Sequence, residues 1–146
     1  MQLNDAIALA QQFLAKQERS ESSLFDYLIN KGCSSDTAQS VLETAKENSW
    51  VSDERFCLRY CEQQLCKGYG PILITENLRD KGLSTAAIIK AVSSIEHSTW
   101  EQAAILALEK KFGRDFNNSS RISLVQYLER RGFNDDYMMF LVKDHL

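Results

Sequence analysis

The chain has 146 residues, of which 44% are hydrophobic and 25% are charged, and this composition is typical of a globular protein. No apolar run approaches the roughly 20 residues that a membrane-spanning helix needs. The N-terminus lacks the basic start and the small-residue cleavage site of a signal peptide. The sequence therefore favours a cytoplasmic protein without a membrane segment, and we expect a monomer.

The formal net charge of −3 is unevenly distributed along the chain. Residues 1–50 carry four basic and seven acidic groups, whereas the two signs balance in residues 51–100 and again in residues 101–146. Proteins that bind nucleic acid through its phosphates usually carry a basic surplus. A protein partner is therefore favoured over free DNA, and we expect any direct DNA binding to be weak.

One phrase occurs three times at a spacing of 50 residues: DYLINKGCS at 26–34, ENLRDKGLS at 76–84 and QYLERRGFN at 126–134. Each begins with helix-forming residues and reaches a basic residue followed by glycine, the residue that most readily ends a helix in the left-handed conformation. A buried anchor and a Ser or Asn N-cap follow. Each phrase is therefore predicted to be an elbow between two helices, with a positive φ at Gly32, Gly82 and Gly132.

The helix before each elbow is predicted to start at Ser20, Gly70 or Ser120, with Pro71 at a first helical position. Further helices are predicted over residues 3–17, 53–66 and 100–112, the last with a capping box between Ser98 and Glu101. The helix after each elbow has apolar positions at helical spacing. These are Ala38, Ile88 and Met138, then Val41, Ala91 and Leu141, then Leu42, Val92 and Val142.

These elements predict an all-α fold. A single proline and the lack of alternating β-branched segments argue against a sheet. The period divides the chain into three-helix repeats at residues 1–50, 51–98 and 99–146. Because a 50-residue unit buries little surface alone, we expect three tandem repeats stacked into an elongated, curved molecule.

The cysteines are interpreted as reduced packing groups. Cys57, Cys61 and Cys66 fall on one predicted helix, and Cys33 occupies the anchor position of the first elbow. The alternative is a zinc site, which would need paired Cys or His ligands at a spacing that the chain does not show. No metal or cofactor is expected.

The sequence offers few candidates for catalytic residues. His97 and His145 fall near predicted helix ends, where an imidazolium favours the C-terminal dipole; the alternative, a Cys–His nucleophile pair, lacks a recognisable context. The stretch CKGYGPILI at 66–74 could hold an anion at a helix start. It lacks the glycine spacing of a nucleotide-binding loop, and a tight connection between helices is favoured. Trp50 and Trp100 lie at the joints between repeats and are predicted to be core residues.

The basic residue before each elbow glycine has two possible roles. A cation in the last turn stabilises a helix by about 0.3–1 kcal/mol. Alternatively, equal repeats would present equal cations to an extended, acidic or helical partner. The candidate partner-binding residues are Arg55, Arg59, Lys67, Arg79 and Lys81, with Lys31 and Arg131 as weaker equivalents.

The phrases together resemble the RecX family, regulators of the bacterial recombinase RecA. The similar segments are LAKQERSESSLFDYLINKG (14–32), SDERF (52–56), KGYGPILITENLRDKGL (67–83) and LVQYLERRGF (124–133). They are in register over nearly the whole chain. Ser23 and Ser52 depart from the family pattern, which commonly has acidic residues at both positions, and the acidic charge balance departs from the basic character of many members.

The resemblance implies a non-enzymatic modulator that lies along the groove of the RecA–single-stranded-DNA filament. There it would limit filament growth and damp the ATPase, strand-exchange and co-protease activities. The alternative from a different class is a helix-turn-helix protein that reads DNA directly. Such a reader needs Arg, Asn or Gln on the second helix of each unit, and STAAIIKAVSSIEH (84–97) offers little beyond Lys90.

Overall fold

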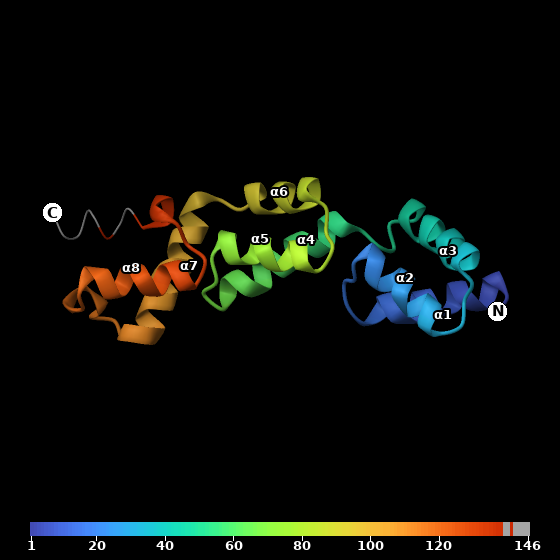
Figure 1. The fold of residues 1–146 in the computed structure, drawn as a ribbon, viewed down its shortest axis with the longest axis horizontal. Coiled ribbons are helices and arrows are strands. Elements are labelled where there is room, and N and C mark those ends of the chain that lie inside the picture. Colours follow the sequence, from blue (N-terminus) through green and yellow to red (C-terminus); the bar gives the residue numbers. More distant parts are fainter. Residues whose placement is uncertain (139–140, 142–146) are drawn as a thin grey trace. The chain divides into compact units, whose positions relative to one another are not determined.

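The computed structural model describes residues 1–138 and residue 141, and every regular element in that part of the chain is helical (Figure 1). The predicted all-α fold is therefore confirmed. The α-helices and the two short 3-10 helices (η) are α1 (Leu3–Lys16), α2 (Glu21–Asn30), α3 (Ser35–Glu47), α4 (Asp53–Cys66), α5 (Pro71–Asp80), α6 (Thr85–Ser94), α7 (His97–Phe112), η1 (Phe116–Asn118), α8 (Arg121–Arg130) and η2 (Asp135–Tyr137).

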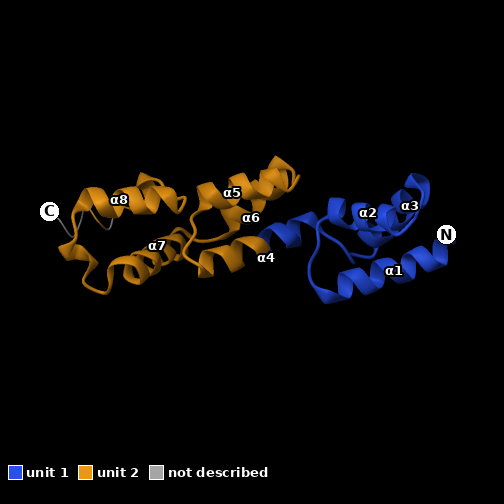
Figure 2. Cartoon of the chain, turned by 60° about the horizontal axis from the view of Figure 1, so that its bottom comes forward, with its two compact units in different colours: residues 1–59 blue, residues 60–146 orange. Residues whose placement is uncertain are grey.

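The chain forms two compact units, residues 1–59 and residues 60–146 (Figure 2). The boundary falls inside α4, which contributes residues to both units. The division into three repeats at residues 1–50, 51–98 and 99–146 stays a prediction.

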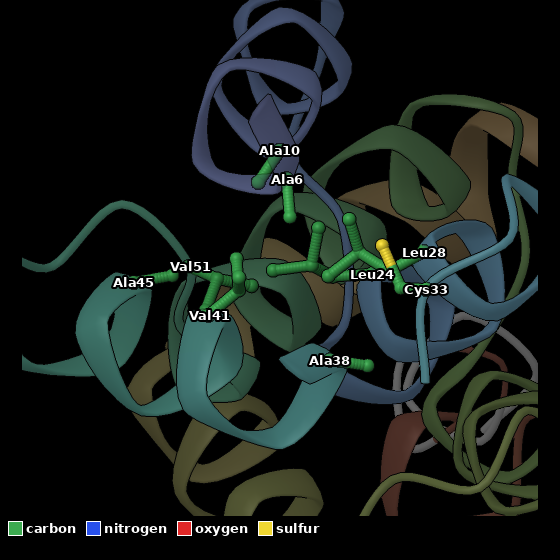
Figure 3. Packing of buried hydrophobic residues seen from close by; sticks show 9 residues of the cluster. All are labelled: Ala6, Ala10, Leu24, Leu28, Cys33, Ala38, Val41, Ala45 and Val51. Atoms are coloured by element: carbon green, nitrogen blue, oxygen red, sulfur yellow. The ribbon is translucent and has the colours of Figure 1, made fainter. Parts of the chain in front are cut away.

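In the first unit, α1, α2 and α3 each pack against the other two. Alanines one turn apart on α1 meet leucines one turn apart on α2, so small and large side chains interlock in the core (Figure 3). The buried cluster consists of Ala6, Ala10, Leu24, Leu28, Cys33, Ala38, Val41, Ala45 and Val51. Trp50 packs against this cluster, as predicted, but it is only partly buried and is not a member of the buried core.

In the second unit, α5 packs against α6, and α7 packs against α8, η1 and η2. Trp100 is 1% exposed, as the sequence predicted, and lies edge-on to Tyr137 at 6.4 Å between ring centroids. The phenyl ring of Phe133 is equally buried. The two large aromatic side chains thus anchor the end of the unit that contains α7 and η2.

The three elbows have the same backbone geometry. Gly32, Gly82 and Gly132 have φ values of 98°, 89° and 96°, which confirms the prediction. In each elbow the glycine N–H donates to the carbonyl of the residue three positions earlier. The N–H of the residue after the glycine donates to the carbonyl of a leucine five positions before that residue, at 3.0–3.2 Å. This pair of bonds is a Schellman motif, which satisfies carbonyls that the end of a helix otherwise leaves without donors.

The third elbow also binds the start of α5. The N–H of Gly70 donates to the Arg131 carbonyl at 2.7 Å, and the N–H of Ile72 donates to the Gly132 carbonyl at 3.0 Å. A β-carbon added to Gly132 would lie 2.5 Å from the Leu73 Cβ, and one added to Gly70 would overlap the Gly132 carbonyl. Gly70 and Gly132 are thus needed because two backbones approach closely, a reason that the sequence pattern did not reveal.

The start of α7 differs from the prediction. The helix begins at His97 with Glu96 as its N-cap, so Ser98 lies inside the helix and the expected capping box is wrong. A side-chain cap contributes only about 1 kcal/mol, which the contacts of His97 with Tyr137 and Glu101 in the longer helix can offset. His97 consequently lies at a helix start instead of a helix end, stacks on Tyr137 and approaches Glu101 Oε1 at 3.2 Å.

The end of the chain is described only in part. Met138 and Leu141 are buried, as predicted. The residue after the third elbow, Asn134, caps the short helix η2 through a bond from the Asp136 N–H. The predictions for Val142 and His145 lie outside the described residues.

The cysteines divide into three buried thiols and an exposed one. Cys33, Cys57 and Cys61 are buried, as expected for packing groups. Cys66 is exposed, so its interpretation as a partly buried group is wrong. Burial raises the pKa of the Cys57 thiol from 9.0 to about 11, with a smaller contribution from the negative charge of Asp53.

We expect Gly132→Ala to lower the free energy of unfolding by about 1–3 kcal/mol more than Gly32→Ala. Both glycines have a positive φ and make the same pair of elbow hydrogen bonds, so the two substitutions introduce similar backbone strain. A β-carbon at Gly32 meets nothing within 4 Å, whereas one at Gly132 collides with Leu73. Urea unfolding followed by circular dichroism measures the difference, and equal losses would contradict the close approach.

The buried Cys57 thiol should make stability fall at alkaline pH. Because its pKa is raised in the folded state, its contribution is complete below about pH 9 and is lost as the pH rises through about 11. The unfolding free energy of Cys57→Ala should therefore decline less between about pH 8 and about pH 11 than that of the wild type. Cys66→Ala, which removes an exposed thiol, should keep the wild-type slope; parallel curves for all three proteins would contradict the assignment.

Candidate functional site

Three of the predicted basic residues flank helix α5. Lys67 precedes the helix, Arg79 lies in its last turn and Lys81 is its C-cap, and all three are exposed. With a rise of about 1.5 Å per residue, the 10-residue helix separates its ends by about 15 Å. The structure therefore places these cations at the two ends of one helix.

Lysines at two of the elbows lie over tyrosine rings. The Lys81 Nζ is 5.6 Å from the ring centroid of Tyr60, and the Lys31 Nζ is 5.6 Å from that of Tyr27. At this distance the face of an aromatic ring attracts a cation. Tyr27 is one helical turn before Lys31 and could have been found from its spacing. Tyr60 comes from α4, so only the tertiary structure brings it to Lys81.

Arg79 borders a groove of about 290 Å³ in the second unit. Glu76 and the 43% exposed Ile72 line it from α5, and Asn134 and Tyr137 line it from the chain after α8. Burial and the neighbouring Asp136 raise the pKa of Tyr137, and its phenol is a hydrogen-bond donor and acceptor. The groove is thus lined by an apolar side chain, by one acidic and one basic side chain, and by hydrogen-bonding groups.

Arg55 is bound within the first unit. Its Nε lies 2.9 Å from Glu18 Oε1, while its two terminal nitrogens donate to the carbonyls of Ser49 and Trp50 at 2.9 and 3.3 Å. These bonds join the end of α1 and the α3–α4 connection to the first turn of α4. Arg59, one turn further along α4, is exposed.

Arg131 is half-buried and is also bound internally. Its Nε donates to the Gly68 carbonyl at 3.2 Å, a terminal nitrogen donates to the Lys67 carbonyl, and its guanidinium lies 3.9 Å from the Tyr69 ring centroid. Alignment of the repeats makes Arg131 equivalent to Lys31 and Lys81. The structure gives it a different environment from theirs.

The connection at residues 66–74 uses most of its N–H groups in hydrogen bonds within the chain. The N–H groups of Gly70 and Ile72, which a bound anion would need, donate to carbonyls of the third elbow. Gly68 adopts a positive φ of 83° at the end of α4. These contacts favour the connecting role over anion binding.

Neither a metal centre nor a membrane span is found in the described part of the chain. Residues 1–138 and 141 contain no group of three His, Cys, Asp or Glu side chains that could hold a metal ion. The helices formed by the described residues are too short or too polar to cross a bilayer.

The chain is similar to known regulatory proteins over most of its length. A family model for RecX, first three-helix domain, matches residues 6–44. The Regulatory protein RecX of Legionella pneumophila (strain Corby) is 32% identical over 144 residues, which cover 97% of this chain and 95% of that protein. The Regulatory protein RecX of Haemophilus ducreyi is 29% identical over 129 residues, covering 88% and 85%.

Solved structures share the fold. The crystal structure of RecX from Lactobacillus salivarius matches with a TM-score of 0.80 at 18% identity and covers 97% of this chain and 95% of that one. A second crystal structure, of regulatory protein RecX, matches with a TM-score of 0.76 at 21% identity, covering 97% and 73%. Because its Legionella relative is 32% identical over 97% of this chain, and because the family model matches residues 6–44, the chain belongs to the RecX family of regulatory proteins.

Proposed function

We propose that this protein binds the RecA–single-stranded-DNA filament and inhibits its recombinase, ATPase and co-protease activities. It does so by limiting filament growth or by lying in the filament groove, and it performs no chemistry of its own. Through this inhibition it tunes homologous recombination, DNA repair and the SOS response. Membership of a family of regulatory proteins supports the proposal.

The observation that carries the proposal is the pair of exposed basic ends of α5. A nucleoprotein filament presents acidic side chains and phosphates at regular intervals, and Lys67 at one end of α5 and Arg79 with Lys81 at the other can meet such groups. The exposed Ile72 and the groove beside Arg79 add an apolar contact between these ends. The arrangement suits a partner that extends along the helix.

Direct reading of DNA is less well supported. The exposed face of α3 carries Asp36 and Glu43, and its Gln39 amide already donates to Glu43 at 3.1 Å. On α6, Ile89 is 57% exposed and points an apolar group where a reader would need a hydrogen-bonding one. Acidic and apolar groups on these helices disfavour entry into the major groove.

The two functions are separated by a pair of titrations. Adding the protein to RecA on single-stranded DNA should reduce ATP hydrolysis at concentrations at which the protein alone leaves the DNA unbound. Raising the salt concentration weakens a phosphate-dominated interaction steeply. Binding to DNA alone at the same concentrations, with the same salt dependence as inhibition, would favour the DNA-reading alternative.

Reversal of the α5 cations should weaken inhibition. We expect Lys67→Glu, Arg79→Glu and Lys81→Glu together to raise the concentration that halves the RecA ATPase rate at least about tenfold, equivalent to about 1.4 kcal/mol. Helix content by circular dichroism should change little, because exposed charges contribute little to folding.

The control variant carries two charge reversals instead of three, at Lys110 and Lys111, which are exposed in the last turn of α7. This variant changes the charge of another helix C-terminus and should inhibit almost as well as the wild type. If both variants lose inhibition equally, net charge alone explains the effect and the α5 assignment is wrong.

A further inference from the structure

Arg131 differs from the two lysines at the equivalent positions of the other elbows. Lys31 and Lys81 are exposed, and each lies over a tyrosine ring. The Arg131 guanidinium lies 5.9 Å from the Tyr127 ring centroid but only 3.9 Å from that of Tyr69, and it is half-buried. An arginine at this elbow therefore reaches a segment that the lysines at the other two do not contact.

That segment is the connection that carries Lys67. The Arg131 side chain donates to the carbonyls of Lys67 and Gly68, and its own carbonyl accepts the Gly70 N–H at 2.7 Å. With the stacked Tyr69 ring, one residue contacts four consecutive residues of the connection. A β-carbon on Gly68 would lie 3.4 Å from Arg131 Nη2 and 3.0 Å from the Ala107 Cβ, so the connection is packed on both sides.

We propose that Arg131 is a positioning residue that fixes the main chain at Lys67 and thereby directs the Lys67 ammonium toward the partner. The inference rests on the proposed function, since it assigns Lys67 a partner contact. Two donors of Arg131 are used within the molecule, and we infer that its effect on the partner is exerted through Lys67. This role is an alternative to the direct partner contact that the repeat alignment predicted for Arg131.

The geometry requires arginine. A guanidinium is planar and carries five donors, so it can bond two carbonyl oxygens while its face stacks on a ring. A lysine ammonium is a compact charge on a flexible chain and reproduces neither feature. Arg131→Lys therefore keeps the charge and removes the arrangement, which separates positioning from simple electrostatic attraction.

Limited trypsin digestion tests the positioning without any partner. The enzyme cuts after Lys67 only when the connection opens, and Arg131 holds the carbonyl of that bond. We expect Arg131→Lys to speed the cut between Lys67 and Gly68 about tenfold, as for loss of one hydrogen bond from a charged group. The control is Arg130→Lys, because Arg130 is exposed in the last turn of α8 with its guanidinium 6.0 Å from the Tyr127 ring. It should leave the rate of this cut unchanged.

A double-mutant cycle tests whether Arg131 acts through Lys67. Arg131→Lys should weaken inhibition of the RecA ATPase about threefold or more in the wild-type background and should have no further effect in the Lys67→Ala background. A role in overall stability would lower inhibition equally in both backgrounds and would overturn the proposal. Unchanged inhibition by Arg131→Lys would overturn it as well.

The two arms distinguish this inference from the proposed function. If the wild-type protein leaves the filament ATPase unaffected, the proposed function fails and the partner contact of Lys67 fails with it. If the wild type inhibits and Arg131→Lys matches it in inhibition, only the inference fails. A Lys67–Gly68 bond that is cut equally fast in both proteins would overturn it independently of RecA.

Discussion

The contact between the third elbow and the start of α5 is the constraint on which the second unit depends. Two main-chain hydrogen bonds join Gly70 and Ile72 to the carbonyls of Arg131 and Gly132. They form only because both Gly70 and Gly132 lack a β-carbon at the closest approach. The same contact satisfies the N–H groups of the N-cap Gly70 and of Ile72 in the first turn of α5, and it joins residues that are 60 and 61 positions apart in the sequence.

The basic residues fall into two groups. Arg55 and Arg131 each donate two hydrogen bonds to carbonyl oxygens within their own unit. Lys67, Arg79 and Lys81 remain at the surface around α5. Arginines that bond main-chain oxygens hold connections in place, whereas the exposed cations are available for a partner. Their separation at the two ends of one helix suits recognition of an extended surface better than recognition of a small ligand.

A regulatory protein that acts by binding depends on the shape and charge that it presents to its partner. The elbows repeat one local geometry, but the residue before each glycine is used differently, over a tyrosine ring at Lys31 and Lys81 and as a clamp on a neighbouring connection at Arg131. Repetition thus supplies the scaffold, and single substitutions within it specialise each elbow. The described part of the chain has buried thiols that serve the core, as the raised pKa of Cys57 reflects.

The sequence by itself determined the helices, the three glycine elbows and the family, because helix ends obey local rules: only glycine readily takes the positive φ found at Gly82, and a serine such as Ser84 caps the next helix. Local rules failed at Ser98, which lies inside α7 instead of capping it. Only the tertiary structure separated Arg131 from its equivalents, since its bond to Gly68 spans 63 residues. A contact across such a separation depends on how whole helices pack, and no repeat spacing encodes it.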